Sequence, residues 1–335
     1  MQPTDEQGQF IGLTDLASAR GGGKALLAND EFFAPKENLL KPGRGIFIPD
    51  KYTDRGKWMD GWESRRKRGA GYDWCIIRLG IPGIIRGVDI DTNHFLGNHP
   101  PFASIDACAA SAAASLRSAD WTEILPKSPL APGSQNIYPT SPTSDNRRWT
   151  HVRLNIYPDG GVARLRIFGE AVPDWKKLRR KALIDLAAVE SGGRIEATSD
   201  KFFGVPENLL MPGRALTMGD GWETKRRRGP GYDWAVVRLG HAGTITKIEV
   251  DTNHFKGNYP DTCSIDACSA PDGIIDPQNI EAAAWSELLN STKLHAHKRH
   301  LFTRQLKKLG SVTHLRLNIF PDGGVSRLRV WGKIS

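Results

Sequence analysis

The chain lacks the features that place a protein in a membrane or direct it out of the cell. None of its apolar runs approaches the roughly 18 residues that a helix needs to span a bilayer. The first ten residues, MQPTDEQGQF, have no basic segment followed by an apolar stretch, so we expect no secretory signal. We therefore expect a cytoplasmic protein with no membrane partner.

Cysteine is also scarce. The four cysteines are Cys75, Cys108, Cys263 and Cys268, and no two of them have CxxC spacing. We therefore expect neither a zinc site nor a disulfide framework, and buried free thiols in a reducing cytoplasm are the simpler interpretation. The sequence also has no G-x-S-x-G motif, and no helix-turn-helix or RNP-type signal that would indicate nucleic-acid binding.

What the sequence does contain is a long internal repeat. Residues 60–108 and 220–268 are identical at 29 of 49 positions, and residues 153–169 match residues 316–332. The shared residues include Arg, Asp, Asn, His, Trp and Glu, whereas a repeat kept only for packing needs no more than a hydrophobic period. The duplication therefore indicates a duplicated site or interface.

The repeat predicts two domains, at residues 13–170 and 191–335, joined by a helical segment at residues 171–190. Each unit is too long for a solenoid repeat, which has roughly 20 to 50 residues, and is large enough to bury its own core. The first copy alone carries an extra segment, residues 45–59, before its Asp-Gly-Trp-Glu motif.

Short apolar runs separated by Gly, Pro, Asn and Asp predict an all-β fold. Residues 74–79 (WCIIRL) are typical of a buried strand, and the alternation at residues 88–94 puts Val88 and His94 on one strand face. Residues 153–169 alternate about a Pro-Asp-Gly-Gly turn, which predicts a β-hairpin with polar residues on one face. Many short strands with turn signals favour two tandem jelly-roll β-sandwiches over βαβ units.

Two basic runs, residues 65–68 (RRKR) and 225–228 (KRRR), follow the Asp-Gly-Trp-Glu motifs. With the net charge of +9, they favour anionic partners. Such runs are usually solvated charge or a phosphate-binding patch, but guanidinium groups can also hold a carboxylate by paired hydrogen bonds. Arg66 and Arg68 are identical in the second copy and are the candidates, whereas Arg65 and Lys67 differ and are expected to face solvent.

The Asp-Gly-Trp-Glu loops themselves, with Trp62 and Glu63, leave two interpretations open. Two carboxylates beside an indole can bind polar N–H groups and perform acid–base work if burial raises one pKa. A solvated loop, with Asp60 capping a turn and the indole as an anchor, is the simpler alternative.

The most specific group is Asp-Thr-Asn-His-Phe at residues 91–95, followed by Asn98 and repeated at residues 251–258. Its histidine, His94, can exchange a proton near neutral pH. The alternative is a histidine that bonds to its own turn. A divalent metal ion also stays open as a cofactor, although one imidazole with scattered oxygens is weak ligand evidence.

These strings together resemble the allantoicase family over both halves of the chain. The resemblance implies duplicated jelly rolls related to galactose-binding-like domains, hydrolysis of allantoate to ureidoglycolate and urea, and a small-molecule partner. It also fits a homo-oligomer that binds neither nucleic acid nor membrane. The predicted catalytic residues are Glu63, His94, Glu223 and His254. The predicted substrate-binding residues are Trp62, Arg66, Arg68, Asp91, Asn93, Asn98, Arg153, Asn155 and Arg166, with Trp222, Arg226, Arg228, Asp251, Asn253, Asn258, Arg316, Asn318 and Arg329 in the second copy.

Two other classes stay open at this level. A tandem lectin-like protein that binds carbohydrates or anions without catalysis is the first, because jelly-roll sandwiches host many functions. A nucleic-acid binder that uses the two basic runs is the second and would bind in a steeply salt-dependent manner.

Overall fold

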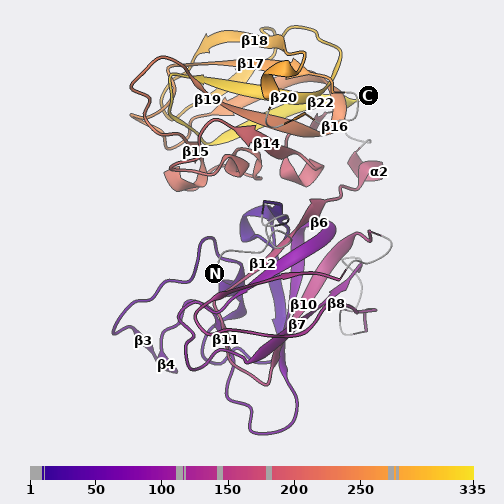
Figure 1. Cartoon of the computed structure of the whole chain (residues 1–335), viewed down its shortest axis with the longest axis vertical. Coiled ribbons are helices and arrows are strands. Elements are labelled where there is room, and N and C mark those ends of the chain that lie inside the picture. Colours follow the sequence, from indigo (N-terminus) through magenta and orange to yellow (C-terminus); the bar gives the residue numbers. More distant parts are fainter. Residues whose placement is uncertain are drawn as a thin grey trace. The chain divides into compact units, whose positions relative to one another are not determined.

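The structure, a computed structural model, describes Phe10 and residues 12–110, 116, 118–141, 146–178, 183–270, 275–276 and 279–335. The chain divides into two compact units, Met1–Val172 and Pro173–Ser335 (Figure 1). Both are built almost wholly from antiparallel strands, which confirms the all-β prediction. No helix among the described residues is long and apolar enough to cross a membrane.

The first unit contains twelve named strands among its described residues. They are β1 (Thr14–Asp15), β2 (Lys24–Ala28), β3 (Tyr52–Thr53), β4 (Gly56–Lys57), β5 (Trp62–Glu63), β6 (Asp73–Asp91), β7 (Phe102–Cys108), β8 (Thr122–Pro129), β9 (Gln135–Pro139), β10 (Trp149–Tyr157), β11 (Gly161–Val162) and β12 (Arg164–Ala171). Two 3₁₀ turns, η1 (Ala19–Gly21) and η2 (Lys36–Leu40), lie between them.

The long strand β6 builds the sandwich of the first unit because it belongs to both layers. Its first part pairs with β2 and β10, and its last part pairs with β9 and β12. Between these parts the register with β10 shifts, from Arg78 opposite His151 to Gly83 opposite Trp149. The alternating apolar residues of β10 and β12, such as Leu154 and Ile167, are fully buried between the layers.

Apart from the hairpin β3–β4, the second unit repeats this topology strand for strand, as the duplication predicted. Its strands are β13 (Ile184–Asp185), β14 (Arg194–Thr198), β15 (Trp222–Glu223), β16 (Asp233–Asp251), β17 (Thr262–Cys268), β18 (Ser286–Lys293), β19 (Arg299–Phe302), β20 (Ser311–Phe320), β21 (Gly324–Val325) and β22 (Arg327–Ile334). Its 3₁₀ turns are η3 (Val189–Ser191), η4 (Pro206–Leu210), η5 (Met218–Asp220) and η6 (Ile280–Ala282). Two tandem jelly rolls are therefore confirmed.

The predicted hairpin at residues 153–169 is wrong. β10 pairs with β6 and β7, whereas β12 pairs with β1 and β6, so the two strands do not pair with each other. Their connection passes through β11, which pairs with β5. The reason is that β6 offers separate edges to both strands, and alternation within β10 and β12 cannot reveal which partner each one takes.

The segment predicted to be helical, residues 171–190, contains little helix. The helix α2 (Trp175–Leu178) has four residues, residues 179–182 lie outside the described part, and Ile184–Asp185 form β13. β13 pairs with β22 at the edge of the sheet, so sheet pairing overrides the helix-forming composition of this stretch.

Candidate functional site

In the first unit, the candidate site begins at β5, which places Glu63. The indole of the preceding Trp62 is fully buried and donates to the carbonyl group of Asp30 at 2.8 Å. β11 pairs with one edge of β5, and on the other edge the amide N–H of Glu63 donates to the carbonyl group of Ala34 at 3.1 Å. Because the backbone is held from both sides, the position of the Glu63 carboxylate is well defined.

The loop after β6 supplies His94. β6 ends at Asp91, so the prediction that His94 shares a strand face with Val88 is wrong. His94 has a left-handed backbone with φ of 68°, and its side chain is exposed. The next residue, Phe95, is fully buried and packs so closely on Gly161 that a Cβ there would lie 2.0 Å from the phenylalanine ring. This buried ring anchors the loop and presents His94 outwards.

Glu63, His94 and Asn98 line one open pocket of about 410 Å³. The side-chain amide of Asn98 donates to Glu63 Oε1 at 2.7 Å. The imidazole of His94 lies beside the ring of Phe47, with centroids 5.6 Å apart. The volume falls in the roughly 300–1,000 Å³ range of small-molecule sites. Three residues that sequence reasoning selected from two separate motifs therefore meet in one cavity.

The extra segment of the first copy, residues 45–59, forms a wall of this pocket. Its hairpin β3–β4 lies at the outer edge of the first unit (Figure 1). Phe47, Arg55, Lys57 and Met59 from this segment line the pocket. We missed Arg55 and Lys57 at the sequence level because we gave weight only to residues that both copies carry. Two cations in an extra segment beside the Asp-Gly-Trp-Glu motif were the available signal.

The pocket alters the acid–base behaviour of Glu63. Burial raises the pKa of the Glu63 carboxyl above its ordinary value, and the hydrogen bond from Asn98 offsets part of this rise. Apolar side chains such as Phe33 and Leu96 complete the lining. A carboxylate with a raised pKa is a stronger base than an exposed one, which suits it to accept a proton near neutral pH.

The structure corrects our expectation for Lys67 of the basic run and adds an ion pair at Arg65. Lys67 Nζ lies 2.8 Å from the buried carboxylate of Asp73, and Arg65 Nε lies 2.7 Å from that of Asp30. Lys67 is therefore only partly exposed, contrary to our expectation, whereas Arg65 faces solvent as expected although it also pairs with Asp30. The replacement of Lys67 by Arg227 in the second copy preserves this contact, because Lys and Arg both supply a cation. Arg227 makes the matching ion pair with Asp233.

Arg66 and Arg68, which alternate with these two, are exposed. Among the described residues they have no hydrogen bond, ion pair or ring contact, and the same is true of Arg226 and Arg228. Contacts within the described part of the fold therefore do not explain why these arginines are identical in the two copies. These four guanidinium groups remain available to an anionic ligand.

Asp91 and Asn93 hold the start of the extra segment. The carboxylate of Asp91 is buried and accepts from Nε and Nη2 of Arg44, both at 2.8 Å. The side-chain amide of Asn93 donates to the carbonyl group of Gly45 at 2.8 Å. The matching contacts of the second unit join Asp251 to Arg214, and Asn253 to the carbonyl group of Ala215. These predicted substrate-binding residues thus position the walls of the site.

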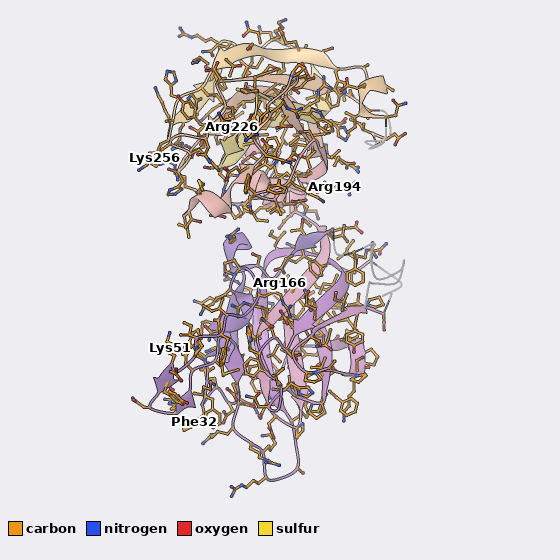
Figure 2. All side chains as sticks on the ribbon, turned by 60° about the vertical axis from the view of Figure 1, so that its left-hand side comes forward. Phe32, Lys51, Arg166, Arg194, Arg226 and Lys256 are labelled. Carbon is orange, nitrogen blue, oxygen red and sulfur yellow. The ribbon has the colours of Figure 1, made fainter. Side chains whose placement is uncertain are left out.

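The predicted residues of β10 and β12 lie elsewhere. Arg153 and Asn155 both donate to the carboxylate of Asp106 on β7, at 2.8 Å. Arg166 Nη2 donates to the carbonyl groups of residues 41 and 43, and Figure 2 shows Arg166 apart from Phe32 and the extra segment. None of the three is among the described residues that line the pocket. In the second unit Arg316 and Asn318 bond to Asp266, and Arg329 bonds to the carbonyl groups of Met211 and Gly213.

The second unit has the same residues at the matching positions, but its histidine makes a different contact. The indole of Trp222 is again buried, and the side-chain amide of Asn258 again donates to Glu223, at 2.5 Å. The ring of His254, however, donates through Nε2 to the carbonyl group of Ala215 at 3.0 Å. Its imidazole is therefore bonded to its own unit, whereas that of His94 lines an open pocket.

No group of three His, Cys, Asp or Glu side chains within the described part of the chain has the arrangement of a metal site. The four cysteines are free and buried, as expected from their spacing.

Comparisons with known proteins match nearly the whole chain to one family. The sequence profile of the Allantoicase repeat matches residues 14–172 and 184–335. Over 320 residues the chain is 52% identical to "Probable allantoicase 1" of Burkholderia mallei, covering 96% of this chain and 94% of that one. It is also 52% identical to "Probable allantoicase" of Pseudomonas aeruginosa, covering 95% of each chain. The crystal structure of allantoicase from Saccharomyces cerevisiae superposes with a TM-score of 0.83 at 37% identity, covering 99% of this chain and 98% of that one.

Proposed function

The chain belongs to the allantoicase family, and we propose that it hydrolyses allantoate to ureidoglycolate and urea in purine breakdown. The observation that carries this proposal, beside the family, is the pocket in which Glu63, His94 and Asn98 meet. The family match over the full chain favours this enzyme over the lectin-like alternative.

The reaction replaces one ureido group of allantoate by a hydroxyl group. A bond forms between the central carbon and the oxygen of water, the bond from that carbon to one ureido nitrogen breaks, and a water proton ends on the departing urea. We propose that Glu63 accepts the proton from water, because its raised pKa makes it the stronger base. His94, exposed on the same pocket, delivers a proton to the departing nitrogen.

The remaining polar groups fit the rest of the substrate. Allantoate has one carboxylate and two ureido groups, and the Asn98 side chain can exchange hydrogen bonds with a ureido group while it holds Glu63. Arg66 and Arg68 are exposed and follow Glu63 closely in sequence, so we propose that they attract the anionic substrate towards the pocket.

We further propose a cytoplasmic homo-oligomer whose two functional units are residues 13–170 and 191–335. Four buried free thiols fit a reducing compartment. Phe202 and Leu216 of the second unit are 65% and 83% exposed, which fits a contact with another copy. A monomeric mass in solution by light scattering would contradict the oligomer.

The experiment that tests the function is urea release from allantoate by the purified protein. Glu63→Gln and His94→Ala should each lower kcat by roughly 100-fold or more, because one acid or base group typically contributes that much. Glu223→Gln and His254→Ala, assayed beside them, measure the matching pair of the second unit. Turnover by Glu63→Gln and His94→Ala at the unmodified rate would remove both residues from the mechanism. Dialysis against a chelator and readdition of divalent metals would show whether a metal ion takes part.

A further inference from the structure

Part of the pocket lining beside Glu63 comes from residues 45–59, a wall that the second copy lacks. We propose that Lys57 in this wall binds the carboxylate of the substrate in the first unit. This inference rests on the proposed hydrolysis of an anionic ureide at the same pocket.

Lys57 is the cation of the pocket wall that is free to bind an anion. Its ammonium group lies 4.5 Å from the centroid of the Phe47 ring, and no carboxylate among the described residues pairs with it. The other cation, Arg55, is engaged: it donates to the carbonyl group of Phe32 at 2.9 Å and stacks on that ring. The aromatic contact holds the Lys57 ammonium group in place without neutralising its charge.

The electrostatics of the pocket require such a group. Glu63 is the sole acidic residue among those that line it, and as an ionised base it would repel an anionic substrate. A lysine in the lining of the same pocket offsets that repulsion and favours one orientation of the substrate. Apolar neighbours such as Met59 strengthen the attraction because they exclude water from part of the cavity.

The second unit lacks this cation. Five residues, 215–219 (ALTMG), stand there in place of the fifteen of residues 45–59, and none of them is Lys or Arg. The Met218 sulfur takes a hydrogen bond from Asn258, and His254 is bonded to Ala215. The base and its amide partner are thus present twice, whereas a lysine in the segment before Asp-Gly-Trp-Glu occurs only in the first copy. The second unit carries a lysine elsewhere, Lys256, at the position of the pocket-lining Leu96.

The test compares Lys57→Gln with Lys57→Arg, and uses Lys51→Gln as the matched control. Lys51, labelled in Figure 2, lies on the same segment and stacks on Trp58 at 3.9 Å. It is not among the described residues that line the pocket. For Lys57→Gln we expect KM for allantoate to rise roughly 10- to 100-fold, the usual worth of a charge-assisted hydrogen bond, with a smaller change in kcat. Lys57→Arg should recover part of the loss, and Lys51→Gln should match the unmodified enzyme.

A binding measurement separates this inference from the proposed reaction. N-carbamoylglycine has the carboxylate and one ureido group but no second ureido group to lose, and calorimetry gives its Kd. Weaker binding to Lys57→Gln than to Lys51→Gln is the expected result. An unmodified enzyme that releases no urea would overturn the proposed function alone. An active enzyme in which Lys57→Gln keeps KM and Kd within twofold would overturn the role of Lys57 alone.

Discussion

The buried carboxyl group of Asp89 offers a test of the structure, because among the described residues it has no paired cation, whereas its counterpart in the second unit has one. Asp89 on β6 is 4% exposed, its Oδ2 accepts from Gln135 at 2.7 Å, and its Oδ1 has no hydrogen-bond partner. At the matching place in the second unit, both oxygens of Glu249 accept from Arg299, at 2.9 and 2.6 Å. The two copies therefore differ by one cation around an equally buried acid.

The missing cation decides whether ionised Asp89 stabilises or destabilises the first unit. Burial raises the pKa of Asp89 from 3.8 to about 6. A carboxyl whose pKa is raised on folding favours the native state below pH 3.8, and this contribution is lost as the pH rises through 6. A shift of about two units corresponds to about 3 kcal/mol at pH 7.5. Asp89→Asn removes the ionised form and keeps an acceptor for Gln135, so it should stabilise the first unit by about 1–3 kcal/mol.

Hydrogen exchange at peptides of β6 and β16 measures each unit separately, which a single unfolding curve of a two-unit chain does not. Asp89→Asn should slow exchange in the first unit at pH 7.5, and the gain should shrink towards pH 5. The control Glu249→Gln removes the partner of Arg299 and should speed exchange in the second unit. If Asp89→Asn instead destabilised its unit at pH 7.5, or gave the same gain at both pH values, the reasoning would be refuted.

Three further predictions concern the candidate site and the basic run that follows it. Asn98→Ala removes a hydrogen bond that lowers the pKa of Glu63, so the acidic limb of the kcat/KM profile should move to higher pH; an unmoved limb would exclude Glu63 as the titrating base. The double variant Arg66→Gln, Arg68→Gln should change the free energy of unfolding by less than about 0.5 kcal/mol. Lys67→Gln removes the cation beside a buried carboxylate and should cost about 1–3 kcal/mol, with both changes read from hydrogen exchange at peptides of the first unit.

The fold could be predicted from the sequence because the two copies could be compared with each other. Alternation within each copy identified the strands, and the repeat of whole motifs set the number of jelly rolls. The order of the strands could not be predicted in the same way. β10 and β12 are joined by a turn typical of a hairpin, yet each pairs with a different part of β6. A strand of 19 residues that serves both layers leaves no local signature.

The candidate site could be predicted in part for a related reason. Glu63 and Asn98 belong to motifs that both copies carry, and their side chains meet although they lie 35 positions apart. The partner of Asp91 could not be foreseen, because Arg44 is 47 positions away in a turn with no strand to place it. Lys57 escaped notice because it has no counterpart in the second copy.

Repetition of a polar residue is therefore an ambiguous sign of function, and the reason is energetic. Removing one partner of a buried ion pair typically costs roughly 3–5 kcal/mol, so pairs such as Asp60 with Arg164 persist in both copies for the sake of the fold. Identity is informative where no such partner exists, as at Arg66 and Arg68. A difference between the copies is informative where one copy has an additional charged residue beside a base that both copies carry, as with Lys57 beside Glu63. Since a guanidinium group without a partner adds little to stability, function is the remaining reason to keep it twice.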